Sequence, residues 1–182
     1  MRALCGFCLL SCLSAIAVAS DACDSLIPES LSVQLTATYS GYRLPREEDN
    51  LPEDIKVARE NSESACLGVA TADFDGDGNV DYLIGLTAAN GSGALIVVGL
   101  KRKVHWELHK LATWPDNRAR LYVSAEPAGK FERLGGLDGP LEEGEVESLK
   151  CPNPVAVFGA TESTGVAYCY VKPKWKHVYI SD

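Results

Sequence analysis

The sequence predicts an all-β fold of antiparallel strands, built from two similar units. From Cys66 onward, short segments rich in β-branched and aromatic residues alternate with turns that contain Gly and Asn. The Asn90-Gly91 pair between two of these segments is a strong hairpin signal, because both residues tolerate positive φ. The order of strand, small-residue turn, strand, basic turn and Trp-bearing strand then recurs near the C-terminus.

Residues 1–19 are predicted to be a secretory signal peptide. Arg2 precedes a largely apolar stretch, Leu9 to Ala19, which ends in the small-residue pattern Ala17-Val18-Ala19. No other segment approaches the ~20 apolar residues that a membrane-spanning helix needs. Residues 20–182 are therefore expected to form a single β domain that is periplasmic or secreted.

The mature chain is expected to be acidic. The formal net charge of the 182 residues is −8, and removal of Arg2 with the signal peptide leaves −9. Nucleic acid and anionic membranes are poor partners for such a chain, whereas a metal cation or a cationic protein is a good one.

Four of the seven cysteines remain after removal of the signal peptide, namely Cys23, Cys66, Cys151 and Cys169. An even number in an oxidising compartment argues for two disulfides. Three pairings are possible, and we favour Cys23 with Cys66 and Cys151 with Cys169. A lipid anchor on Cys23 is the rival interpretation of that residue, although Asp21 fits a lipoprotein signal poorly.

The segment that precedes the first unit is predicted to hold one strand and one helix. Ser32 to Tyr39 can supply a strand, whereas Leu44 to Ser64 is rich in Glu, Asp, Pro and Asn and is not strand-like. Within it, Pro52 to Glu60 is predicted to be a short helix, because proline and acidic residues are typical of a helix N-terminus.

The first unit spans residues 66–111. Three of its strands are predicted at Tyr82–Thr87, Gly93–Leu100 and Val104–Leu111. The last of these alternates apolar with polar residues, which indicates a half-buried strand.

A long acidic loop is predicted over residues 125–154, after a strand at Leu121–Ser124. The loop is rich in Gly and Glu, and a loop of this length in a small domain is usually functional or disordered. Its glutamates are candidate partner-binding residues, namely Glu142, Glu143, Glu145 and Glu147.

The second unit, residues 155–182, is interpreted as a degenerate repeat of the first. The run from Gly159 to Trp175 parallels the run from Gly85 to Trp106 in its order of strands and turns. The two tryptophans recur with the repeat, and we predict that both are core residues.

The most informative segment of the chain is Asp73-Phe-Asp-Gly-Asp-Gly-Asn-Val-Asp81, because its carboxylates repel one another unless a cation binds them. Calcium takes six to eight oxygen ligands, and this spacing supplies them. Gly76 and Gly78 permit the positive φ that lets a short segment wrap an ion. An EF-hand would need Glu at its twelfth position, where this chain has Ile84. The predicted calcium ligands are Asp73, Asp75, Asp77, Asp81 and the backbone carbonyl of Asn79.

The run from Val69 to Leu86 resembles the FG-GAP or VCBS-type repeat of integrin α-chain propellers and of many secreted bacterial proteins. In that family the calcium loop joins two strands of a blade, so the resemblance implies a structural calcium ion between strands. It also implies that the two units are propeller-blade-like. Two blades cannot close a propeller, so we expect a sandwich or a propeller-like fragment.

An enzyme is the less favoured interpretation, and no catalytic residue is assigned. GxSxG and HExxH are absent, and the cysteines are expected to be oxidised. His105 and His109 are expected to be solvated strand residues, and His177 is the analogous residue of the second unit.

These features favour a secreted, calcium-stabilised binding protein. The C-terminal unit and the aspartate loop together resemble small periplasmic proteins with FG-GAP-like repeats, some of which are immunity proteins against peptidoglycan hydrolases. This resemblance implies an inhibitor of a cell-wall hydrolase, and the net charge of −9 favours a cationic one. An adhesion module and an uncharacterised hydrolase are the alternatives.

Overall fold

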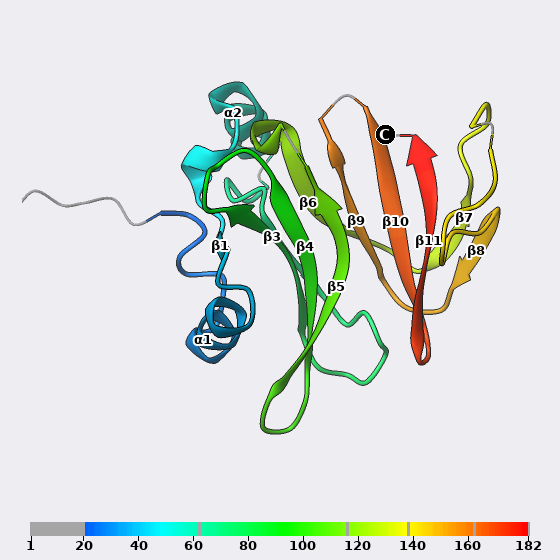
Figure 1. The fold of residues 1–182 in the computed structure, drawn as a ribbon, viewed down its shortest axis with the longest axis horizontal. Helices are drawn as coiled ribbons and strands as arrows, with labels where there is room; N and C mark the ends of the chain where they lie inside the picture. Colours follow the sequence, from blue (N-terminus) through cyan, green and yellow to red (C-terminus); the bar gives the residue numbers. More distant parts are fainter. Residues whose placement is uncertain (1–20, 62, 116, 138, 162, 182) are drawn as a thin grey trace, which may run out of the picture.

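The computed structural model describes residues 21–61, 63–115, 117–137, 139–161 and 163–181, so the signal peptide predicted at residues 1–19 lies outside the described residues. Strands dominate, and in the described residues they form two large antiparallel sheets packed face to face, with a separate two-stranded sheet (Figure 1). The predicted all-β, antiparallel class is confirmed. Of the two arrangements expected, the described residues form the sandwich, and they do not close into a barrel.

The first sheet contains the first predicted unit. Its strand order is β1-β3-β4-β5, and β2 pairs with the beginning of β3 on the same side as β1. A β-bulge interrupts the register of β4 with β5 between Ile96 and Val97. The strands are β1 (Tyr42–Arg43), β2 (Val69–Ala72), β3 (Asp81–Ala88), β4 (Ala94–Lys101) and β5 (Trp106–Trp114).

The second sheet contains the second predicted unit, in the order β11-β10-β9-β6. Its strands are β6 (Leu121–Glu126), β9 (Val155–Ala160), β10 (Thr164–Val171) and β11 (Lys174–Ser181). Both units are therefore three-stranded meanders, β3-β4-β5 and β9-β10-β11, that lie in opposite sheets (Figure 1).

The segment 125–154, predicted to be one long loop, is only partly a loop. It includes the end of β6 and two further strands, β7 (Gly129–Glu132) and β8 (Ser148–Cys151), which pair with each other. Leu149 and Cys151 of β8 pack against the outer face of the second sheet. The segment folds back because these apolar residues alternate with exposed ones and have a sheet face to cover.

The chain also forms two α-helices, α1 (Glu29–Thr38) and α2 (Pro52–Glu60), and the single 3-10 turns η1 (Glu47–Asp49) and η2 (Arg118–Arg120). Helix α1 packs on the first sheet, whereas Asp54 of α2 accepts a hydrogen bond from the hydroxyl of Thr161, just after β9. The helix predicted at Pro52–Glu60 is confirmed. The strand predicted at Ser32–Tyr39 is wrong, because residues 32–38 lie in α1 and Tyr39 is its C-terminal cap. Leu31 and Leu35, one helical turn apart, are both fully buried against the first sheet, so tertiary packing overrides a local preference for strand.

The layers produce three apolar cores. The central core lies between the two sheets and includes Phe74, Ile96 and Phe158. A second core lies between α1 and the first sheet, and a third lies between the second sheet and β7–β8. Adjacent residues Leu83 and Ile84 of β3 are both 0% exposed yet belong to different cores, so this strand is buried on both faces.

Two disulfides brace these layers, with the pairing that we favoured. Cys23 is bonded to Cys66 with a Cα–Cα distance of 5.0 Å, and Cys151 is bonded to Cys169 at 5.8 Å. A lipid on Cys23 and this disulfide exclude each other, because both would use the same sulfur atom. None of the helices in the described ranges is long and apolar enough to cross a membrane.

The two tryptophans of the repeat contribute to different cores. Trp106 is 4% exposed and packs in the core under α1, whereas Trp175 is half-buried and packs against the central core. Both therefore serve packing, as predicted.

Candidate metal centre

The aspartate loop joins β2 to β3 at one end of the first sheet. Gly76 and Gly78 have φ values of 72° and 86°, the left-handed conformation that glycine adopts without strain. Phe74 is 0% exposed in the central core and anchors the loop. A Cβ atom on Gly76 would lie 2.7 Å from Oδ1 of Asn153, so the loop also contacts the turn between β8 and β9.

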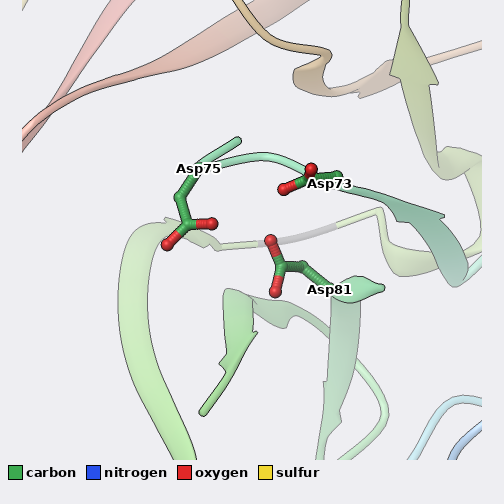
Figure 2. A group of neighbouring side chains, drawn as sticks. All are labelled: Asp73, Asp75 and Asp81. Carbon is green, nitrogen blue, oxygen red and sulfur yellow. The ribbon is translucent and has the colours of Figure 1, made fainter. Parts of the chain in front are cut away.

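Three of the predicted ligands converge. Asp73, Asp75 and Asp81 each offer a carboxylate oxygen, and these oxygens lie within 4.8 Å of one another. Figure 2 shows the three carboxylates directed toward a common space from the loop and the start of β3. Oxygens on opposite sides of a calcium ion lie about 5 Å apart, because each ligand lies 2.3–2.6 Å from the ion. The donor set and its spacing therefore fit calcium.

Asp81 is the buried member of this group, with 0% exposure. Its Oδ2 accepts a hydrogen bond from the Phe74 backbone N–H at 3.0 Å, and its Oδ1 accepts one from the Lys101 backbone N–H at 2.8 Å. Burial raises the pKa of Asp81 to about 6, against the effect of these two bonds, and the charges of Asp75 and Asp77 raise it further. A nearby cation would favour the ionised carboxylate.

Asp77 is not one of the three convergent side chains. Oδ1 of Asp77 accepts hydrogen bonds from the backbone N–H and the side-chain amide of Asn79, at 2.8 and 2.9 Å. The backbone bond is the main reason that the pKa of Asp77 is lowered. The role predicted for the Asn79 carbonyl stays a prediction.

Arg102 contacts the aspartate loop, although the sequence offers no direct sign of this contact. Its Nη1 lies 2.7 Å from Oδ2 of Asp75 and 3.2 Å from Oδ2 of Asp77. Its Nε donates a hydrogen bond to Oε2 of Glu107 at 2.9 Å, and its Nη2 lies 2.8 Å from the same oxygen. Arg102 follows β4, which pairs with β3, so the β4–β5 hairpin signal could have placed this cation beside the loop.

The acidic loop divides into exposed and buried carboxylates. Glu142, Glu143 and Glu147 are exposed, whereas Glu145 is 6% exposed and accepts a 2.7 Å bond from Nε of Arg133. A 2.8 Å hydrogen bond from the Glu142 backbone N–H, followed by the bond from Arg133, lowers the pKa of Glu145. Glu145 therefore anchors the loop, and an acidic contact surface would consist of the other three glutamates.

The histidines are less solvated than the sequence suggested. His105 is exposed, as expected. The ring of His109 lies near Tyr170 and Trp175, and its Nε2 is 2.9 Å from Oε1 of Glu107, without hydrogen-bond geometry.

His177 is 6% exposed and stacks on Tyr168 with ring centroids 4.8 Å apart, so the expectation of a solvated side chain is wrong there. Burial lowers the pKa of His177, against the effect of the neighbouring carboxylate of Glu145. Cross-strand stacking therefore gives this histidine a packing role.

No family model, curated protein or solved structure matches this chain.

Proposed function

We propose that the chain is a secreted or periplasmic binding protein whose β2–β3 loop holds a structural calcium ion, and that its partner is a cationic peptidoglycan hydrolase, which it inhibits. The observation that carries the calcium site is the convergence of Asp73, Asp75 and Asp81. The two disulfides support an oxidising compartment.

Calcium would be held by these three carboxylates, with Asp77 and the Asn79 carbonyl as further donors. The ion would supply positive charge where the chain places four aspartates within nine residues. Because Asp81 begins β3 and Asp73 directly follows β2, the ion would fix the end of the first sheet.

Excess calcium is expected to raise the free energy of unfolding by about 2.7 kcal/mol at a hundredfold excess over Kd, because the ion binds only the folded loop. Calorimetric melting with calcium and with chelator measures the difference. Asp73→Asn should abolish it, and Asp24→Asn, at an exposed aspartate outside the loop, should leave it intact. Equal melting temperatures for the wild type in both conditions would refute the calcium site.

The proposed partner surface is the loop from Leu141 to Glu147, which is attached to β11. The backbone N–H of Val146 donates to the carbonyl of His177, and the His177 N–H donates to the carbonyl of Gly144, both at 3.0 Å. A rigid loop loses less entropy on binding than a mobile one. The exposed glutamates are therefore presented on an anchored segment.

Charge supports a cationic partner. Hydrolases that act on anionic cell walls tend to be cationic, and a chain of net charge −9 without its signal peptide would attract them over about a Debye length. The proposed inhibition would block access of the hydrolase to its substrate.

The purified protein is expected to inhibit at least one member of a panel of peptidoglycan hydrolases in a cell-wall turbidity assay, and to cause no lysis by itself. Changing Glu142, Glu143 and Glu147 to Gln should slow association about tenfold at low salt, with a smaller change in dissociation, because charge acts mainly on the encounter rate. Surface plasmon resonance at several salt concentrations separates the two rates.

The matched control changes Glu29, Glu53 and Glu63, exposed residues on or beside the helices, to Gln. Both triple variants carry the same net charge. If both slow association equally, the loop is not the contact. If no hydrolase is inhibited, the adhesion interpretation gains; lysis by the protein alone would favour the hydrolase interpretation.

A further inference from the structure

We propose that Arg102 sets the calcium affinity of the β2–β3 loop by competing with the ion for Asp75 and Asp77. This inference rests on the proposed calcium site and concerns its regulation. The juxtaposition that carries it is one guanidinium within hydrogen-bond distance of two aspartates of the loop, one of which, Asp75, belongs to the convergent group.

Asp75 is the carboxylate that both cations need. Its side chain is 2% exposed, and its Oδ2 is bound to Arg102 while its Oδ1 accepts the backbone N–H of Asp77 at 3.2 Å. A calcium ion bound by Asp73, Asp75 and Asp81 would share this carboxylate with a full positive charge. Binding of the ion therefore weakens the contact of Arg102 with the loop, and the contact weakens binding of the ion.

Glu107 gives the guanidinium a second position. It accepts a hydrogen bond from Nε of Arg102 and lies 2.8 Å from Nη2, whereas the loop aspartates contact Nη1, and the Glu107 side chain is 43% exposed. Arg102 can release Asp75 and Asp77 and remain paired with Glu107. The release then costs one set of hydrogen bonds and leaves no unpaired charge in the interior.

The size of the effect follows from charge. A divalent ion and a guanidinium about 6 Å apart repel each other by an amount equivalent to about a tenfold change in Kd, even at the dielectric constant of water. Competition for the Asp75 oxygens acts in the same direction. Removing the side chain of Arg102 is therefore expected to tighten calcium binding.

Isothermal titration of calcium into the purified, chelator-treated full chain tests the inference. Arg102→Ala should lower Kd about tenfold, and Arg102→Lys, which keeps the charge but loses the fork, should fall between it and the wild type. Lys103→Ala, which removes an exposed charge of the same hairpin, should change Kd less than about twofold because solvent screens it.

Glu107→Gln provides a second test that leaves Arg102 in place. Without its alternative partner, the guanidinium should remain on the loop and weaken calcium binding. The same substitution should have a much smaller effect in the Arg102→Ala background, because the residue through which it acts is absent.

An equal or weaker affinity in Arg102→Ala, with circular dichroism like that of the wild type, would overturn the inference, since it would make Arg102 a support of the loaded site. If Arg102→Ala does not fold, the double variant Glu107→Gln/Arg102→Lys replaces it. The inference would be overturned if the effects of these two substitutions on the calcium Kd simply added. Failure of both the wild type and Arg102→Ala to bind calcium would instead reject the calcium site itself.

Discussion

Replacing Cys23 and Cys66 with alanine is expected to lower the free energy of unfolding by about 4 kcal/mol, and replacing Cys151 and Cys169 by about 3 kcal/mol. The disulfides close loops with sequence separations of 43 and 18 residues. Because a longer loop restricts the unfolded chain more, the first bond contributes more. Urea unfolding of the two double variants and the wild type measures both losses.

A control keeps all four cysteines and compares oxidised with reduced protein. The loss on reduction should approach the combined loss of the two double variants, because the bonds lie in different layers of the molecule. A larger loss for the shorter loop would contradict the chain-entropy argument.

Asp49→Ala is expected to destabilise the protein by about 3–5 kcal/mol, because it removes the carboxylate that pairs with the buried guanidinium of Arg118. Arg118 is 3% exposed, and its Nη2 lies 3.9 Å from Oδ2 of Asp49. The same carboxylate accepts hydrogen bonds from Arg43 and from the hydroxyl of Thr87, each at 2.8 Å. The substitution therefore removes the acceptor that joins η1 to β3 and η2.

The exposed neighbour supplies the comparison. Glu48 is paired with Arg46, and its side chain is 70% exposed, so Glu48→Ala should cost less than about 1 kcal/mol of unfolding free energy.

The contribution of Asp49 should also depend on pH. Although burial opposes the shift, the bonds from Arg43 and other donors lower the pKa of Asp49. A lowered pKa stabilises the fold above the unfolded value of about 3.9, and this contribution is lost as the pH falls further. The difference between wild type and Asp49→Ala should therefore shrink near pH 3.

Local patterns were sufficient for the strands of the two meanders, for α2 and for the aspartate loop. Each depends on residues close together in sequence: β-branched and aromatic runs between turn residues for the strands, Pro52 at a helix start, and aspartates at positions 73, 75, 77 and 81. The failures lie where distant residues decide. Residues 32–39 favour a strand by propensity, yet Leu31 and Leu35 are buried on one face of a helix against the first sheet.

The same reason explains what was missed at the candidate sites. Nothing in the acidic run distinguishes Glu145 from Glu143, and only the fold, through its burial and its contacts with Arg133 and the Glu142 backbone, shows that Glu145 is structural. Arg102 lies 25 residues from Asp77, so its contact depends on the pairing of β3 with β4. The order of the layers could not be predicted from local patterns either, because it depends on which apolar face of one element packs against which face of another.

The contact between Gly76 and Asn153 has a thermodynamic consequence. The loop belongs to the first sheet, and Asn153 lies in the turn that leads into β9 of the second. Coupling between two sites is reciprocal. If cation binding strengthens the packing of the two sheets by some factor, packing of the sheets strengthens cation binding by the same factor. Substitutions where the two sheets meet, such as at Asn153, would then alter the affinity for the ion without changing any carboxylate.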